Sequence, residues 1–505
     1  MDLFGGICVM GFGRTTKGLV SKRAVENSGL SASLDHSPGA HGEGMSFRHK
    51  VLDRLLFQRK QSLSWCNAKN RIFMTSLSIR VFTAALVILP FAPSFTAEQP
   101  AMNAKEQLRK IRAELKEEHS KGDAAAYLAS AHRLSDLLNG SPSSLLQLMS
   151  AENFAGDRQA ALDSFDQFVR MGQSNEEVLK LKQIELIRND PRFREIHANM
   201  IANTTAISRA SKVFSLEDSG LIPEDIDYDP ATESFYITSV LEKKILVVTK
   251  SGSTKVFALA PDQWPMMALK IDWPRHVLWA TEVALDGFVA SPAKGWGRSA
   301  ILTYDLGTGK LLHRIEGPAH SSLGDMTLTA EGDAIISDGE GGRVYRVDRR
   351  TQQIERLDAG DFISPQTPAM SPDGRRIFVP DYMRGIGILD LETKHVSWIS
   401  MQGAFALSGI DGLYLDGHTL IATQNGTSPE RVVEFKVDPS LSHIESESTI
   451  ERATPALGDP THGVVVDGYF FYLANSGWDA LDDHGNRRPD AKASPPSIMR
   501  AKLGN

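Results

Sequence analysis

The sequence predicts a mainly β protein, a six-bladed β-propeller preceded by a small all-α segment of helical hairpins. From residue 210 onward, short apolar runs alternate with glycine-containing turns, a pattern typical of β-strands. One unit of this pattern recurs six times, which is the signature of a repeat architecture. Before residue 210 the apolar residues follow the 3–4 residue spacing of helices instead.

The repeated unit has the strand content of a propeller blade. Its centre is an apolar strand that ends in a polar residue, and this strand reads FYITS, VLWATE, AIISD, IFVPD, LIATQN and FYLANS in the six units. One strand precedes it and a third follows, while a fourth follows only in the first five units. We therefore expect the segment SKVFSLE, residues 211–217, to complete the sixth blade and close the ring. An irregular β-sandwich is the alternative, but sandwiches do not show six similar units.

Residues 98–209 form the predicted helical segment. The predicted propeller follows, from residue 210 to residue 505. Gly122, Gly140, Gly156 and Gly172 stand where helices are expected to end. The stretch from Leu145 to Phe165 resembles a tetratricopeptide repeat, although only one or two repeats are visible. Because about three repeats make a stable solenoid, we expect this segment to pack on the propeller as a cap or spacer. The alternative is a groove that binds a protein partner.

The N-terminal hundred residues divide into two parts. Residues 74–97 have the layout of a signal peptide, with Met74, Arg80 and an apolar run of about twelve residues from Val81 to Ala92. Such a run is shorter than the ~20 residues of a membrane span, so no stable span is expected; a membrane anchor and a buried helix are the alternatives. Residues 1–73 are interpreted as an upstream extension that is either non-native, with Met74 as the true start, or disordered. The protein is accordingly expected in the periplasm or outside the cell.

Composition excludes several classes of function. The 505 residues carry a formal net charge of -7, so the chain is not expected to bind nucleic acid. The two cysteines, Cys8 and Cys66, are too few for a disulfide scaffold or a cysteine-based zinc cluster. The sequence shows no Gly-x-Ser-x-Gly, HExxH, P-loop or EF-hand pattern, which disfavours those classes of hydrolase and nucleotide- or calcium-binding protein.

Acidic and amide residues recur where the first strand of each unit begins. In a propeller these positions meet around one mouth of the central channel, although they lie far apart in the sequence. They are Glu224 with Asp225, Met266 with Met267, Asp325, Gln366, Asp411 and His462. Carboxylates that gather in one place repel one another unless a cation or raised pKa values relieve them. The set predicts a divalent cation, most simply Ca²⁺, with Zn²⁺, Mn²⁺ and Mg²⁺ as alternatives; otherwise these acids cap strands and turns.

Four segments resemble the SMP-30/gluconolactonase/LRE-like propellers: PEDIDYDP, GDMTLTAEGDAIISD, PQTPAMSPDGRRIFVPDY and GIDGLYLDGHTLIATQNG. The resemblance covers residues 210–505 and implies a divalent metal held by a Glu, an Asn and an Asp. Glu224 matches the first and Asp411 the third, whereas Gln366 stands in place of the metal-binding Asn. Asp325 stands where the family has a second Asn that binds substrate, so the site departs from the family pattern at two positions.

The predicted function is a metal-dependent hydrolase of a small ester or lactone, in which Glu224, Gln366 and Asp411 hold the metal. Asp325 and His462 are the candidate catalytic residues, as proton shuttles, although His462 could equally be a wall residue. Two long loops contribute candidate substrate-binding residues, namely Trp296, Arg298 and Trp478; these loops could instead be solvated. The alternative function is a non-catalytic propeller that binds a small ligand or a protein partner, the latter through the helical segment.

Overall fold

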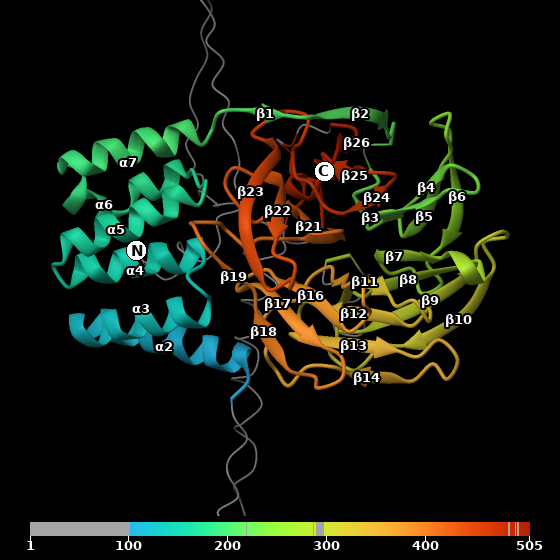
Figure 1. Ribbon diagram of the computed structural model, residues 1–505, viewed down its shortest axis with the longest axis horizontal. Coiled ribbons are helices and arrows are strands. Elements are labelled where there is room, and N and C mark those ends of the chain that lie inside the picture. The colour runs from blue at the N-terminus through green and yellow to red at the C-terminus, as the bar shows by residue number, and fades with distance from the viewer. Residues whose placement is uncertain are drawn as a thin grey trace, which may run out of the picture.

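The computed structural model describes residues 102–504 apart from 219, 286, 289–296, 483–484, 490 and 492–493. It shows a ring of six β-sheets with a layer of helices along one side (Figure 1). The predicted signal peptide and the extension before it lie outside the described residues.

Five blades of the propeller are four-stranded antiparallel sheets and blade 5 has six strands, and the predicted fold class is confirmed. Blades 1 to 3 follow the chain without a break. Blade 1 contains β3 (Pro223–Asp229), β4 (Ser234–Ser239), β5 (Lys244–Val248) and β6 (Thr254–Leu259); blade 2 contains β7 (Met266–Asp272), β8 (Val277–Val283), β9 (Ser299–Asp305) and β10 (Leu311–Glu316); blade 3 contains β11 (Leu323–Leu328), β12 (Ala334–Asp338), β13 (Arg343–Val347) and β14 (Ile354–Arg356).

Blades 4 to 6 keep the same order, and blade 5 is widened. Blade 4 contains β15 (Ala369–Met370), β16 (Arg376–Asp381), β17 (Gly385–Asp390) and β18 (Val396–Trp398); blade 5 contains β20 (Gly412–Asp416), β21 (Thr419–Gln424), β22 (Arg431–Val437) and β23 (His443–Arg452), with the short strands β1 (Ile207–Ser208) and β19 (Ser400–Met401) paired to β23; blade 6 contains β24 (Gly463–Val466), β25 (Tyr469–Ala474), β26 (Ser497–Lys502) and β2 (Ala210–Ser215).

The ring is closed by strands from the two ends of the propeller sequence. Strand β2 pairs antiparallel with β26, from Ala210 opposite Ala501 to Ser215 opposite Ser497. The expected strand at 211–217 therefore completes blade 6, and it covers an edge of β26 that would otherwise expose unpaired backbone groups.

The cores lie between neighbouring blades, where the apolar residues at alternate strand positions meet. Between blades 1 and 2, for example, Tyr236 and Ile245 pack in one cluster with Leu278 and Leu302, and all four are buried. This packing makes each blade depend on its neighbours.

The helices precede the propeller and stack in antiparallel order beside it (Figure 1). Asn103 caps the first helix, accepting a hydrogen bond from the backbone of Glu106, and Gly122 ends it in the left-handed conformation with φ 74°. The elements are α2 (Ala104–Lys121), α3 (Ala124–Leu137), α4 (Pro142–Phe154), α5 (Arg158–Arg170), a 3-10 helix (Glu176–Lys180), α6 (Lys182–Ile187) and α7 (Pro191–Ala202). The resemblance to a tetratricopeptide repeat stays a prediction.

Contacts between the helices and the propeller include the loops that join the second and third strands of blades 3, 4 and 5. Lys105 donates to the carbonyl of Glu340, the guanidinium of Arg384 donates to the carbonyl of Leu137 at 2.8 Å, and Ser174 N donates to Ser428 O at 2.5 Å. Second strands end on the face where first strands begin. The helices therefore rest on the face of the ring that carries the predicted site. Among the described residues, no helix is both long and apolar enough to span a membrane.

Candidate metal centre at the mouth of the channel

Local irregularities of the first strands place the side chains at the channel mouth. In β3, the two residues Glu224 and Asp225 lie opposite the single residue Thr238 of β4, so one extra residue is inserted there. The first strands of blades 2 and 3 begin with similar register shifts, between Met266 and Leu269 and between Leu323 and Asp325. Because such β-bulges redirect side chains, they bring consecutive residues of these strands toward the channel mouth.

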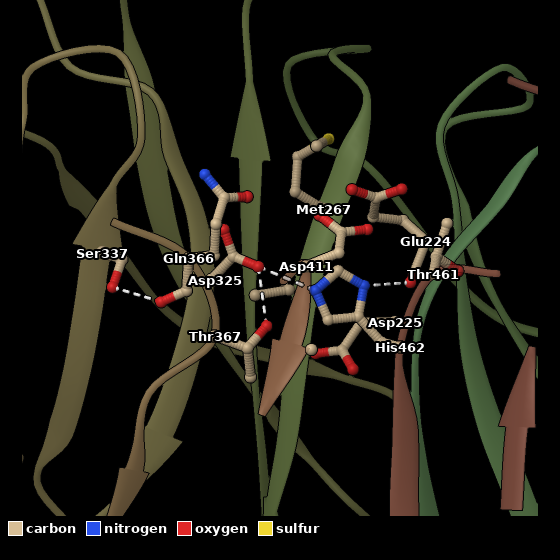
Figure 2. A network of polar contacts seen from close by, with 12 residues as sticks. Glu224, Asp225, Met267, Asp325, Ser337, Gln366, Thr367, Asp411, Thr461 and His462 are labelled. Atoms are coloured by element: carbon tan, nitrogen blue, oxygen red, sulfur yellow. Dashed lines mark hydrogen bonds and ion pairs between the residues drawn. The ribbon is translucent and has the colours of Figure 1, made fainter. Parts of the chain in front are cut away.

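Three ionisable residues from blades 1, 5 and 6 converge at this mouth (Figure 2). Glu224, Asp411 and His462 each offer an atom that could bind a metal, and these atoms lie within 4.8 Å of one another. Their side chains are buried, with exposed fractions of 2%, 0% and 1%. The convergence of Glu224 and Asp411 follows the expectation from the repeat, and His462 joins them.

Both ring nitrogens of His462 form hydrogen bonds with oxygen atoms of the neighbouring blades. Its Nδ1 lies 2.5 Å from the backbone oxygen of Glu224 and its Nε2 lies 2.7 Å from Oδ1 of Asp325. Since a carbonyl and an ionised carboxylate only accept, this arrangement fits the doubly protonated ring. Burial alone lowers the pKa of His462, but the hydrogen bond with Asp325 and the charges of Asp411 and Asp225 raise it to about 10. His462 is thus arranged to hold a proton, and binding a metal would require exchanging one of these bonds.

The remaining acids of the mouth are held by specific donors. Both oxygens of Asp225 pair with Nζ of Lys270, at 2.9 and 2.8 Å. Asp411 accepts from the amide of Asn425 at 2.8 Å. Asp325 accepts from the hydroxyl of Thr367 at 2.7 Å, in addition to His462. The charge of the carboxylates is therefore partly balanced by one lysine and one imidazolium.

Gln366, which the sequence placed among the metal ligands, is hydrogen-bonded within its own loop. Its Nε2 donates to the carbonyl and hydroxyl oxygens of Ser364 at 3.3 and 3.2 Å, and its backbone oxygen accepts from Ser337 at 2.7 Å. These side-chain bonds engage the amide nitrogen and not Oε1, the atom that would bind a metal, so the role of Gln366 as a ligand stays a prediction. Asp325 lies beside His462 as a neighbour, and its role as a proton shuttle stays a prediction.

The three predicted substrate-binding residues fall in different places. Trp296 lies outside the described residues. Arg298 pairs with Glu316 at 2.9 Å and lies over the ring of Trp264, 5.0 Å from its centre, at blade 2. Trp478 reaches the metal-site cluster directly, because its indole Nε1 donates to Oε2 of Glu224 at 2.6 Å.

Several residues of the mouth were not expected as site residues from the sequence. Lys270 lies in the middle of β7, and Tyr414 in β20 accepts from the backbone of Gly463 at 2.7 Å. Burial, with the Asp225 charge, holds the pKa of Tyr414 well above its usual range. A lysine inside the apolar strand MMALKID was a signal for a buried acidic partner, since buried lysines are nearly always paired.

A divalent cation fits the donor set at the mouth. Two buried carboxylates from different blades supply hard oxygen ligands, and hard divalent cations bind through such oxygens. The absence of cysteine from the described part of the chain agrees with this preference. Glu224 and Asp411 are therefore the ligands that the geometry supports best. Two carboxylates and one histidine are compatible with each of the four candidate ions.

Comparisons with known proteins find no matching family and no matching curated protein. Solved structures do match over the propeller. They include a gluconolactonase from Xanthomonas campestris (14% identity, 59% of this chain and 100% of that chain, TM-score 0.39) and a virginiamycin B lyase from Staphylococcus aureus (14%, 58% and 99%, 0.38). A PQQ-bound aldose sugar dehydrogenase from Streptomyces coelicolor also matches (12%, 59% and 99%, 0.41).

At this low identity, these likenesses carry no conclusion about activity. The six closed sheets and the sequence motifs of residues 210–505 are the firmer ground. The sheets show that the chain is a six-bladed β-propeller with a helical segment beside it, and its resemblance to the SMP-30/gluconolactonase propellers stays a prediction from the sequence motifs.

Proposed function

We propose that this protein is a divalent-cation-dependent hydrolase of a small ester or lactone. The observation that carries the proposal is the convergence of Glu224 and Asp411, from blades 1 and 5, with His462 at one buried point. Ca²⁺ is the first candidate ion, and Zn²⁺, Mn²⁺ and Mg²⁺ are the others.

The residues of the mouth have distinct roles in this proposal. When bound, the cation polarises the carbonyl of the ester and lowers the pKa of a bound water. Glu224 and Asp411 supply the carboxylate oxygens that would hold the cation. The side-chain amide of Asn425 fixes the carboxylate of Asp411 through a 2.8 Å hydrogen bond. Nε2 of His462 lies 2.7 Å from Oδ1 of Asp325. In this proposal His462 passes the proton on Nε2 to the alkoxide that leaves the ester or lactone.

A non-catalytic binding propeller is the second candidate, and one observation favours it. The four carboxylates of the mouth already have two positive neighbours, His462 and Lys270, so the mouth could be stable without a cation. These carboxylates are Glu224, Asp225, Asp325 and Asp411. In that case the channel would bind a small ligand, or the helical segment a protein partner. The signal-peptide pattern further supports a periplasmic or secreted protein, which the intact mass of the natural protein would test.

The first experiment measures thermal unfolding of the chelator-treated full chain during titration with Ca²⁺, Zn²⁺, Mn²⁺ and Mg²⁺. A ligand that binds only the native state at ~100-fold excess over its Kd raises the free energy of unfolding by ~2.7 kcal/mol. We expect one ion to raise the melting temperature, and Glu224→Gln and Asp411→Asn to abolish the increase. Turnover of a panel of lactones and esters should follow the same ion and the same variants.

Two matched variants control for the loss of a carboxylate. Glu233→Gln changes an exposed glutamate of the β3–β4 turn that pairs with Lys250, and Asp416→Asn an exposed aspartate of β20. Both should keep the ion response. If no ion shifts the melting temperature, the cation-dependent mechanism is wrong; ion binding without turnover on any lactone or ester would favour the binding propeller.

A further inference from the structure

Trp478 connects blade 6 to a carboxylate of blade 1. It begins a short 3-10 turn, Trp478–Ala480, between β25 and β26, and only 9% of its surface is exposed. Its indole N–H donates to Oε2 of Glu224 at 2.6 Å, while its ring packs edge-to-face on Phe288 with centroids 5.9 Å apart. The side chain is therefore held both by an apolar contact and by a polar one.

The turn that carries Trp478 is anchored on each side of it. The buried carboxylate of Asp459 accepts from the backbone of Gly477 at 3.1 Å and of Asp479 at 3.0 Å. Gly477 has φ 91°, a conformation that favours glycine, and a β-carbon there would lie 2.9 Å from Cδ1 of Ile222. Because the backbone is tied down immediately before and after Trp478, the direction of the indole is determined by the turn.

The hydrogen bond restricts how Glu224 can bind a cation. A carboxylate binds a metal through one oxygen or through both, and Ca²⁺, with six to eight ligands, accepts either mode. Mg²⁺ and Mn²⁺ favour octahedral oxygen sites, and the narrow O–C–O angle of a carboxylate bound through both oxygens distorts that geometry. With Oε2 engaged by the indole, two-oxygen binding by Glu224 would require breaking the 2.6 Å hydrogen bond.

We propose that Trp478 is a positioning residue that keeps Glu224 in one-oxygen coordination and thereby sets the cation selectivity of the site. Asp459 acts one step further out, because it aims the turn. This inference rests on the proposed function, since it assigns to Glu224 the role of a cation ligand. It adds that loss of the indole N–H favours Ca²⁺ over smaller ions.

The test is calorimetric titration of the chelator-treated full chain with Ca²⁺ and with Mn²⁺. Trp478→Phe removes the N–H and keeps an aromatic ring on Phe288. Loss of a hydrogen-bond partner of a metal ligand typically changes affinity by 10–100-fold. We expect the ratio of the Mn²⁺ and Ca²⁺ dissociation constants to rise by about tenfold in Trp478→Phe, because Mn²⁺ loses a preoriented ligand whereas Ca²⁺ gains a second oxygen. Asp459→Ala should change the ratio in the same direction.

Phe288→Leu is the matched control, since it loosens the packing of Trp478 without removing the N–H. If Trp478 only packs the loop, Phe288→Leu and Trp478→Phe will weaken both ions equally and leave the ratio unchanged, and the inference is then wrong. A wild-type chain that binds neither Ca²⁺ nor Mn²⁺ removes the inference, and one that also fails to bind Zn²⁺ and Mg²⁺ removes the proposed function with it. A wild-type chain that binds an ion while Trp478→Phe keeps its selectivity removes the inference alone.

Discussion

Glu282, at the end of β8, is a buried acid outside the metal-site cluster. Its side chain is fully buried, and its Oε1 has no hydrogen-bond partner among the described residues. Its Oε2 accepts from the backbone of Asp262 at 3.2 Å. Burial, followed by the nearby charge of Asp262, raises the pKa of Glu282 to about 7 from the ordinary 4.5. At neutral pH this residue therefore opposes folding.

Replacing this acid should stabilise the protein in a pH-dependent way. Because the pKa of Glu282 is raised in the folded state, its contribution to the free energy of unfolding is fully present below pH 4.5. That contribution is lost as the pH rises through about 7. We expect Glu282→Gln to raise the free energy of unfolding at pH 8 relative to wild type, with a smaller gain at pH 5. Urea denaturation at the two pH values measures this difference; an equal effect at both would contradict it.

Glu316, in the same blade, has the opposite effect on how stability depends on pH. Hydrogen bonds with Arg314 and Arg298 lower its pKa, so its contribution is present above pH 4.5 and is lost as the pH falls. Glu316→Gln should accordingly destabilise the protein at pH 8, by a small amount because the pair is exposed to solvent.

A single strand, β2, closes the ring of blades. Leu216, directly after β2, is fully buried in a cluster with Leu473 and Ile498 of blade 6 and Phe235 of blade 1. Its backbone N–H donates to Pro496 O at 2.8 Å, which continues the pairing of β2 with the strand β26. The strand thus seals the junction of the first and last blades with apolar contacts as well as backbone hydrogen bonds.

Leu216→Ala should cost about 2–5 kcal/mol of unfolding free energy, because it leaves a cavity in this junction. Val256→Ala in β6 is the control, since Val256 is 52% exposed and its loss should cost no more than about 0.5 kcal/mol. Chemical denaturation compares the two. Equal costs would show that β2 contributes little to closure.

The helical segment and the propeller are joined by contacts that suggest one cooperative unit. Arg384, in the loop between β16 and β17, donates to Leu137 O of α3 and to Asp361 O, and its guanidinium lies 4.1 Å from the ring centre of Trp398. The side chain of Asn139 returns a hydrogen bond to Arg384 O at 3.0 Å. Arg384 therefore links α3 to blade 4, beside the contacts of Lys105 and Ser174 with blades 3 and 5.

Arg384→Ala should separate the unfolding of the helices from that of the propeller. In the wild type we expect far-ultraviolet circular dichroism, which follows the helices, and tryptophan fluorescence to report coincident transitions. In the variant the helical signal should be lost at a lower temperature. Arg376→Ala, which removes a hydrogen bond to Ser440 O inside the propeller, should keep the transitions coincident; separate transitions in the wild type would contradict the prediction.

The architecture could be read from the chain because a repeat constrains every unit in the same way. Six similar strand patterns and a missing fourth strand in the last unit were enough to predict the ring and its closure by β2. The same logic placed Glu224, Asp411 and His462 together, since residues at equivalent positions of the blades surround one channel.

The direction of individual side chains was decided by the tertiary structure alone. The amide nitrogen of Gln366 donates to Ser364, and His462 engages both a carbonyl of blade 1 and Asp325 of blade 3. The bond from Trp478 to Glu224 joins residues 254 positions apart. Periodicity specifies which backbone positions meet, whereas β-bulges, turns and neighbouring charges specify where each polar group points, and these depend on contacts between blades that no local pattern contains.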